Sequence, residues 1–344
     1  MGRVALLLCA MIWGTSFVVL KNALDSMGTM WVLSIRFTVS ALVMLAVAGK
    51  RIKTVSKRCV QGSALMGLCL ALAYIVQTYG LVFTTPSKNA FLTATYCVLT
   101  PFLAWWVYKR KPGLANVIAA FLCITGIGFV SLNEGIGRVN IGDMLTLLCG
   151  IFYSFQIIVL EQYRDSGDAV TISAVQFATA AVICWVGALL FEAPPVNVPL
   201  NAWGEIAYLS FVCTALCFFL QAWGMKYTNS SIAAMIMTLE SVFGALASVL
   251  FYHEVITGKM LLGFVLIFFA VTCSELKLPF FRKKDAQKAS TSQIQPAGWR
   301  AMFCPDKGLL DSKRLYYIGA GDNDAVCRAG FLRRISMHCG KMRP

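Results

Sequence analysis

The chain has 344 residues, of which 58% are hydrophobic and 13% charged, and its mean hydropathy is +0.71. This composition excludes an ordinary soluble globular protein. The net charge of +14 arises from short Lys and Arg clusters between apolar runs, a pattern that marks membrane topology and gives no reason to expect a nucleic-acid partner.

Apolar runs of about 20 residues, the length that crosses a bilayer as a helix, recur along most of the chain. The first run follows Arg3 as in a signal peptide, but Trp13 interrupts it and no small-residue cleavage site follows, so we interpret it as a retained span. A short polar link near 133–138 separates five expected spans from five more. The expected spans are about 4–23, 30–49, 60–83, 86–108, 113–132, 141–162, 169–190, 203–225, 229–251 and 259–276.

The stretch from Gln77 to Arg110 is repeated from Gln221 to Glu254, at an offset of 144 residues. The aligned pairs include Gly80 with Gly224, Phe83 with Tyr227, Thr84 with Thr228, Ser87 with Ser231 and Tyr96 with Glu240. The chain is therefore interpreted as an internal duplication.

The first spans of the two halves align at an offset of 140, which pairs Trp13 with Tyr153 and Arg36-Phe37 with Gln176-Phe177. Because each half holds an odd number of spans, the halves are expected to lie antiparallel, as in the inverted repeats of secondary transporters. The predicted fold is an all-α polytopic membrane protein of ten transmembrane helices in two inverted five-helix repeats. The repeats are expected at 1–132 and 141–276.

The basic clusters at 50–58, 109–111 and 277–284 orient the chain. With the N-terminus inside, these clusters fall in cytoplasmic loops, so both termini are expected to be cytoplasmic and the protein to lie in the plasma (bacterial inner) membrane. Residues 285–344 are polar, Gly-rich and basic, and we expect a disordered cytoplasmic tail. An abnormal C-terminus, such as a shifted reading frame, stays open. Cysteine and histidine spacing predicts no metal site, and no cofactor is expected.

Glu240 is the one charge in its apolar segment, where a carboxylate in lipid is costly and is functional by default. Two stripes of small residues, which allow helices to approach closely, run along the fourth and ninth spans. They comprise Ser87, Ala90, Ala94, Cys97, Pro101 and Ala104, and Ser231, Ala234, Thr238, Ser241, Ala245 and Ser248. If these helices cross, Tyr96 and Glu240 lie near the midplane, where such transporters bind substrate. Packing alone is the alternative explanation of the stripes.

The remaining candidates for substrate binding or coupling are polar or aromatic residues within spans. Each also has a structural explanation: Trp13 as core filler, Arg36 as half of an internal pair, and the glutamines as bridges between helices. The glutamines are Gln77, Gln156 and Gln221. Pro101 is expected to kink the fourth span and to assist gating.

Several segments resemble the EamA-type transporters of the drug/metabolite transporter superfamily. They are WGTSFVVLK in the first span, the Arg36-Phe37 pair, LTPFLAWWVYKRKP and LESVFGALASVLFYHE. The resemblance covers about 1–284 and implies a ten-helix exporter or permease for small metabolites, often amino acids, that works by alternating access. The chain departs from the family in its tail, which is longer than the family usually needs.

The predicted function is a secondary transporter for an amino acid or related metabolite, with proton-coupled efflux of hydrophobic or cationic drugs as the alternative. In either case Glu240 could alternately hold a proton and a cationic group. An enzyme is not expected, because the only histidines, His253 and His338, lie at a span end and in the tail. The expected partners are the lipid bilayer, a small molecule and protons, with the protein as a monomer or weak dimer.

Overall fold

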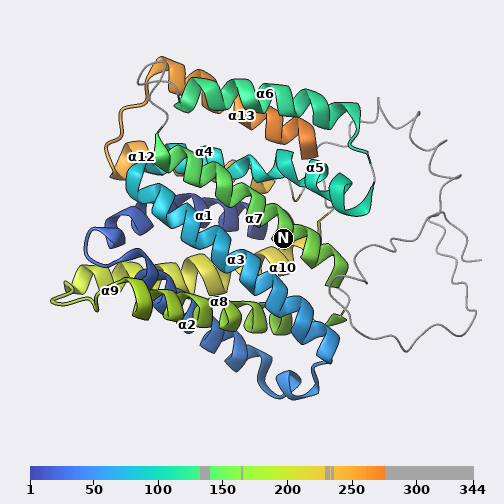
Figure 1. Ribbon diagram of the computed structural model, residues 1–344, viewed down its shortest axis with the longest axis vertical. Helices are drawn as coiled ribbons and strands as arrows, with labels where there is room; N and C mark the ends of the chain where they lie inside the picture. The colour runs from blue at the N-terminus through green and yellow to red at the C-terminus, as the bar shows by residue number, and fades with distance from the viewer. Residues whose placement is uncertain (110, 132–139, 164–165, 229–232, 234–235, 276–344) are drawn as a thin grey trace, which may run out of the picture. The chain divides into compact units, whose positions relative to one another are not determined.

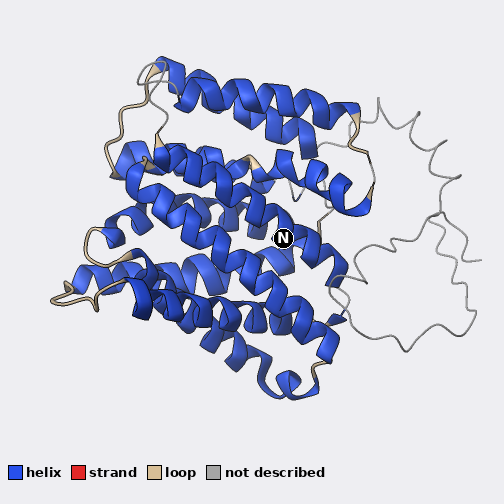
Figure 2. Cartoon of the chain, in the orientation of Figure 1, coloured by secondary structure: helices blue, strands red, loops and turns tan. Residues whose placement is uncertain are grey.

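The structure is a computed structural model that describes residues 1–109, 111–131, 140–163, 166–228, 233 and 236–275. The expected link near 133–138, the tail at 285–344 and most of 229–235, including Ser231 and Ala234, lie outside the described residues. Within the described ranges the regular structure is helical and no strand occurs (Figure 2).

The first half contains six α-helices and one 3₁₀ helix. They are α1 (Gly2–Leu24), α2 (Thr29–Ala48), η1 (Gly49–Thr54), α3 (Lys57–Phe83), α4 (Pro86–Ala94), α5 (Tyr96–Tyr108) and α6 (Leu114–Ser131). The second half contains α7 (Ile141–Tyr163), α8 (Ala169–Phe191), α9 (Leu200–Ala207), the π-helical η3 (Tyr208–Leu216), α10 (Cys217–Lys226), α12 (Leu239–Phe251) and α13 (Gly258–Glu275).

Eight helical segments of the described chain are long and apolar enough to cross a membrane. They are Gly2–Leu24, Thr29–Thr54, Lys57–Phe83, Pro86–Tyr108, Leu114–Ser131, Ile141–Tyr163, Ala169–Phe191 and Leu200–Gln221. Two shorter apolar helices, Leu239–Phe251 and Gly258–Ser274, follow them. Large apolar side chains such as Phe121, Leu189 and Val182 are exposed on the outside of the helices, as contact with lipid requires. The expectation of an all-helical, multi-pass membrane protein is confirmed.

The fourth expected span is interrupted at Thr95, which separates α4 from α5, and not at Pro101, which lies inside α5. Pro101 has no N–H to donate to the carbonyl of Cys97, and that carbonyl accepts a 3.1 Å hydrogen bond from the Ser274 hydroxyl of α13. A side chain from a neighbouring helix thus replaces the missing backbone bond, as hydrocarbon surroundings demand.

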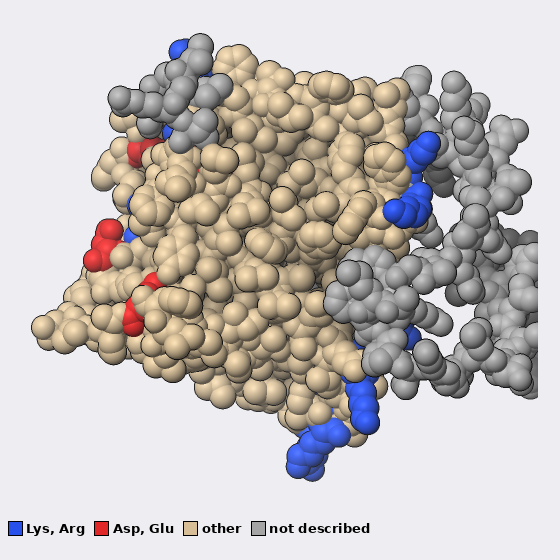
Figure 3. Space-filling model, in the orientation of Figure 1, with Lys and Arg blue, Asp and Glu red and all other residues tan. Residues whose placement is uncertain are grey.

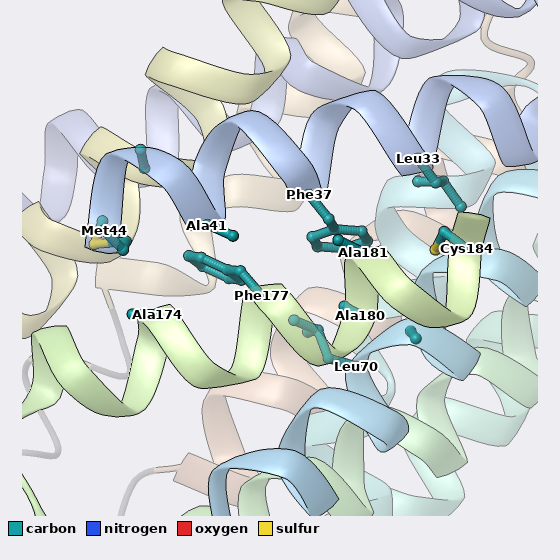
Figure 4. Packing of buried hydrophobic residues seen from close by; sticks show 12 residues of the cluster. Leu33, Phe37, Ala41, Met44, Leu70, Ala174, Phe177, Ala180, Ala181 and Cys184 are labelled. Atoms are coloured by element: carbon teal, nitrogen blue, oxygen red, sulfur yellow. The ribbon is translucent and has the colours of Figure 1, made fainter. Parts of the chain in front are cut away.

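The most extensive contacts join helices of one half to helices of the other. They pair α3 with α7, α2 with α8, α6 with α13 and α1 with α12. Figure 1 shows α6 lying along α13, and α2 lying along α8. The α2–α8 contact buries apolar side chains, and Figure 4 shows Phe37 and Phe177 pointing into the space between these two helices. Their ring centroids are 6.2 Å apart.

Glycines allow several of these helix pairs to approach to backbone contact. A Cβ atom on Gly80 of α3 would lie 2.9 Å from the carbonyl oxygen of Gly142 in α7. A Cβ atom on Gly224 of α10 would lie 3.0 Å from the carbonyl oxygen of Gly2 in α1. Any larger residue at these positions would push the helices apart.

We predict that Gly80→Ala destabilises the protein by about 1–3 kcal/mol, because the added methyl group meets backbone that cannot yield. The matched control is Gly128→Ala in α6, where an added Cβ would have no neighbour within 4 Å. Thermal unfolding in detergent micelles measures the difference. Equal melting temperatures for the two variants would contradict the backbone contact between α3 and α7.

Candidate functional site

Aromatic rings from α2, α3, α5 and α7 gather around Tyr74 of α3. The Tyr74 ring packs edge-on against Phe37 at 5.1 Å and against Tyr153 at 5.8 Å between centroids. Tyr96, in the first turn of α5, packs against Tyr153, with the two ring centroids 5.8 Å apart. The fold therefore brings the candidate Tyr96 next to Tyr153, which the sequence had only aligned with Trp13.

A second group of rings repeats this pattern around Phe218, which stands 144 residues after Tyr74. Phe218 packs edge-on against Phe177 at 4.9 Å and against Trp13 at 5.5 Å. Phe177 and Trp13 are the residues that align with Phe37 and Tyr153, so both ring contacts of Tyr74 have counterparts around Phe218. The indole nitrogen of Trp13 also donates a 2.7 Å hydrogen bond to the carbonyl of Cys213.

Arg36 is the charged residue of the first group and is 2% exposed. Its Nε donates to the Thr214 hydroxyl at 2.8 Å, and its guanidinium carbon lies 4.8 Å from the centroid of the Tyr74 ring. No ion pair joins it to any residue in the described ranges. Thr214 belongs to the π-helical segment η3, a backbone form common at functional sites. The guanidinium is thus held by a neutral hydroxyl and a ring, and its charge is not neutralised by a described carboxylate.

Glu240 lies in the first turn of α12 and is half-buried. Among the described residues, none makes a hydrogen bond or ion pair with its carboxylate, and Arg36 is no exception. Four side chains lie within electrostatic range of both Glu240 and Arg36: Tyr74, Tyr153, Cys213 and Cys217. Arg36 and Glu240 therefore lie near one group of side chains without pairing directly. We name Arg36, Glu240 and these four side chains the central cluster.

Gln77 is fully used by contacts within the protein. Its Oε1 accepts from the Tyr153 hydroxyl at 2.9 Å, and its Nε2 donates to the Thr93 hydroxyl at 2.9 Å. Asn89 donates both to the Gln77 carbonyl at 3.2 Å and to the Thr146 hydroxyl at 2.8 Å. This buried network joins α3, α4 and α7 and is a structural use of the glutamine.

The other two glutamines make no such contacts. Gln221 is half-buried in α10, and Gln156 in α7 is 8% exposed; neither has a hydrogen bond to a described residue. Gln176, which aligns with Arg36, is 3% exposed, and its Nε2 has no partner in the described part of the chain. The two halves thus place aromatic rings at corresponding positions but carry different polar groups.

Sequence reasoning missed Tyr74 and Thr214, which hold Arg36 in place. Tyr74 precedes Gln77 by three residues and so shares its helix face, which was the available signal. Thr214 carried no signal, because its contact with Arg36 joins residues 178 apart in sequence. The described residues contain no group of His, Cys, Asp and Glu side chains able to hold a metal ion, and their cysteines form no disulfide.

Comparison with known proteins places this arrangement in a family. Residues 1–132 and 140–275 match the model of the EamA-like transporter family. An uncharacterized transporter of Archaeoglobus fulgidus is 32% identical over 274 residues, covering 79% of this chain and 85% of that protein. The uncharacterized transporter YoaV of Bacillus subtilis is 20% identical over 265 residues, covering 75% and 90%.

A protein of known crystal structure shares the fold, with a TM-score of 0.60 at 14% sequence identity. The match covers 82% of this chain and 98% of that one. The family match extends over well more than half of the chain, and the Archaeoglobus relative is aligned over most of its length. The chain therefore belongs to the EamA-like transporter family, within the drug/metabolite transporter superfamily, and is a membrane transporter.

Proposed function

We propose that the protein is a secondary transporter that moves an amino acid or related small metabolite by alternating access, with the central cluster as its binding site. The observation that carries this proposal is the unpaired Arg36 and Glu240 beside the same aromatic rings. An amino acid offers a carboxylate to Arg36 and an ammonium group to Glu240, and it would neutralise two charges that are costly alone in a membrane. Such a site binds and releases its ligand without chemical reaction, which fits a transporter and not an enzyme.

Gln221 and Gln156 are further candidates for substrate contact, because their amide groups have no hydrogen bond to a described residue. Trp13 would contribute an aromatic wall, since its indole nitrogen is already bonded to Cys213. Tyr96 would contribute another ring beside Tyr153. Gln77 has a structural role instead.

We also propose that the fold consists of ten transmembrane helices in two inverted repeats, 1–132 and 141–276. Exchanging the halves turns the most extensive helix contacts into other observed contacts. The contact of α3 with α7 corresponds to that of α10 with α1, and the contact of α3 with α8 to that of η3 with α2. The close pair Gly80–Gly142 corresponds to Gly224–Gly2 in the same way. The contacts α2–α8 and α6–α13 map onto themselves, as contacts across a pseudo-twofold axis do.

A second candidate function is proton-coupled efflux of hydrophobic cations. A lone carboxylate beside aromatic rings suits such a ligand, because ring faces attract cations. The two functions separate in a growth assay of sensitive bacteria that express the protein. Amino-acid transport predicts resistance to toxic amino-acid analogues, whereas resistance only to tetraphenylphosphonium and ethidium would favour drug efflux.

We place the protein in the plasma (bacterial inner) membrane as a monomer or weak dimer, with both termini in the cytoplasm. On the face drawn in Figure 3, most visible Lys and Arg side chains gather at one end and the Asp and Glu side chains at the other. The basic end would face the cytoplasm.

This orientation yields a topology prediction. Reporters fused after Lys111 or Lys284 are expected to read cytoplasmic, and a reporter fused after Gly135 to read external, because the basic clusters retain their loops inside. Alkaline phosphatase and green fluorescent protein fusions measure the two sides. A cytoplasmic reading after Gly135 would be incompatible with an odd number of spans in the first half.

Glu240→Gln tests the role of the carboxylate as the proton-coupling group. The substitution keeps size and hydrogen bonding but removes titration, so we expect substrate accumulation driven by a pH gradient to fail while substrate exchange persists. Proteoliposomes with and without a pH gradient measure both. If Glu240 only braced the helices against Arg36, all transport would be lost and neutralising Arg36 would partly restore it. Undiminished accumulation with unchanged pH dependence would contradict a coupling role.

The repeat-related pair Gln77 and Gln221 separates structural from binding glutamines. Gln77→Leu is expected to destabilise the protein by about 1–3 kcal/mol, because it leaves the buried partners of the amide unsatisfied. Gln221→Leu should leave the melting temperature unchanged and raise the KM for transport. Thermal unfolding and transport kinetics on the same preparations measure these effects. If Gln221→Leu lowered the melting temperature and left the KM normal, Gln221 would be the structural glutamine and its proposed role in binding would be contradicted.

A further inference from the structure

Second-half carboxylates bond to first-half groups at one end of the helix bundle. Asp143, at the start of α7, accepts from the Thr84 hydroxyl that follows α3, at 2.6 Å. Glu192, just after α8, accepts from the Tyr79 hydroxyl at 2.9 Å and from the backbone N–H of Met30 in α2. The donors are neutral, so these contacts depend on the carboxylates and not on ion pairs.

Glu254 makes a third contact of this kind, between the helix that carries Glu240 and α4. It follows α12, the helix that carries Glu240, and it bonds to Ser87 in the first turn of α4. Its Oε1 accepts from the Ser87 hydroxyl at 2.5 Å, and its Oε2 accepts from the Ser87 N–H at 3.3 Å. Its Oε2 also accepts from the hydroxyl of Ser248 in α12. A carboxylate is favoured at this position, because the N–H groups at the start of a helix carry partial positive charge.

The local backbone holds Glu254 in place for this contact. His253 adopts a positive φ of 52°, which is unfavourable for a residue other than glycine, and the chain turns back at that point. The Glu254 N–H then donates to the Ser248 carbonyl at 3.2 Å. Ser87 is fully buried, so the bonded groups are shielded from water. A strained turn that delivers a carboxylate to a buried partner suggests a functional contact.

The two helices joined by Glu254 touch again closer to the central cluster. A Cβ atom on Gly244 of α12 would lie 2.8 Å from the Cβ of Ala90 in α4. Further along the chain α4 ends at Ala94, and after Thr95 the helix α5 begins with Tyr96. Glu254 therefore bonds the helix that carries Glu240 to the helix that leads to Tyr96.

The sequence allows this contact at one end only. At the offset of 144, the counterpart of Ser87 is Ser231, but the counterpart of Glu254 is Arg110. An arginine has no acceptor and cannot bind the N–H of a serine. The two ends of the duplicated helices thus differ in chemistry even though their helices correspond.

We propose that Glu254 is a gating residue. Its bonds to Ser87 and Ser248 hold α4 against α12 at the end of the helix bundle where Asp143 and Glu192 also lie, and transport requires this contact to break. This inference rests on the proposed transport by alternating access and adds the residue that closes one end. It also assigns the closure of that end to a contact that the repeat-related end cannot form.

The first test does not need a known substrate. Hydrogen–deuterium exchange of the protein in lipid nanodiscs is compared between wild type, Glu254→Gln and Glu205→Gln. Glu205 of α9 is the matched control, a half-buried carboxylate near the same end without a hydrogen bond to any described residue. Loss of charged hydrogen bonds predicts that Glu254→Gln raises exchange of the first α4 amides about tenfold or more. Exchange in α6 and with Glu205→Gln should stay at the wild-type value, and an unchanged α4 rate in Glu254→Gln would overturn the proposal.

The second test asks whether the contact must open for transport. Ser87→Cys and Glu254→Cys are combined and joined with a short bifunctional methanethiosulfonate reagent. Substrate exchange is expected to fall to background and to return after reduction, while each single variant and the wild type with its native cysteines keep their rates after the same treatment. Full transport by the cross-linked protein would refute the gating role. If the wild type moved no tested substrate, the proposed function would fail, and the exchange measurement would still decide whether Glu254 holds this end closed.

Discussion

In hydrocarbon a backbone polar group without a partner costs several kcal/mol, and this constraint explains most of the architecture. It forces the described chain into helices, and it governs the places where helices end or break. Lys21 of α1 donates to the carbonyls of Leu81, Val82 and Thr84 at the end of α3. Ser274 and Ser154 donate to carbonyls of α5 near its interruption. Side chains from neighbouring helices thereby bind the chain together at its irregular points.

The two halves of the molecule share an arrangement of aromatic rings but differ in the polar groups beside them. The rings around Tyr74 and those around Phe218 make equivalent contacts, so the aromatic framework is common to both halves. Arg36 has an uncharged counterpart in Gln176, and Glu240 has one in Tyr96. The two ionisable groups therefore come from different halves and lie near the same side chains. A duplicated frame can carry such differences because ring packing does not depend on them.

The two halves also differ in their glutamines and in the polar contacts at the ends of the helix bundle. Gln77 is bonded to Tyr153 and Thr93, whereas its counterpart Gln221 has no bond to a described residue. Three second-half carboxylates bond to neutral donors of the first half, and these bonds lie where the chain carries its acidic side chains. The polar contacts between the halves at this end of the helix bundle are thus made by carboxylates of the second half.

The sequence by itself determined the membrane class, the helical fold, the family and the alignment of Trp13 with Tyr153 and Tyr96 with Glu240, because apolar length and repeated spacing are local properties of the chain. The number of spans and the inversion of the repeats stay predictions. Only the tertiary structure decided that the helix breaks at Thr95, that Gln77 is bonded, and that Arg36 is held by Thr214 and Tyr74 without an ion pair to Glu240. These outcomes depend on which side chains meet across helices far apart in sequence, and spacing along one helix carries no information about the residue that faces it.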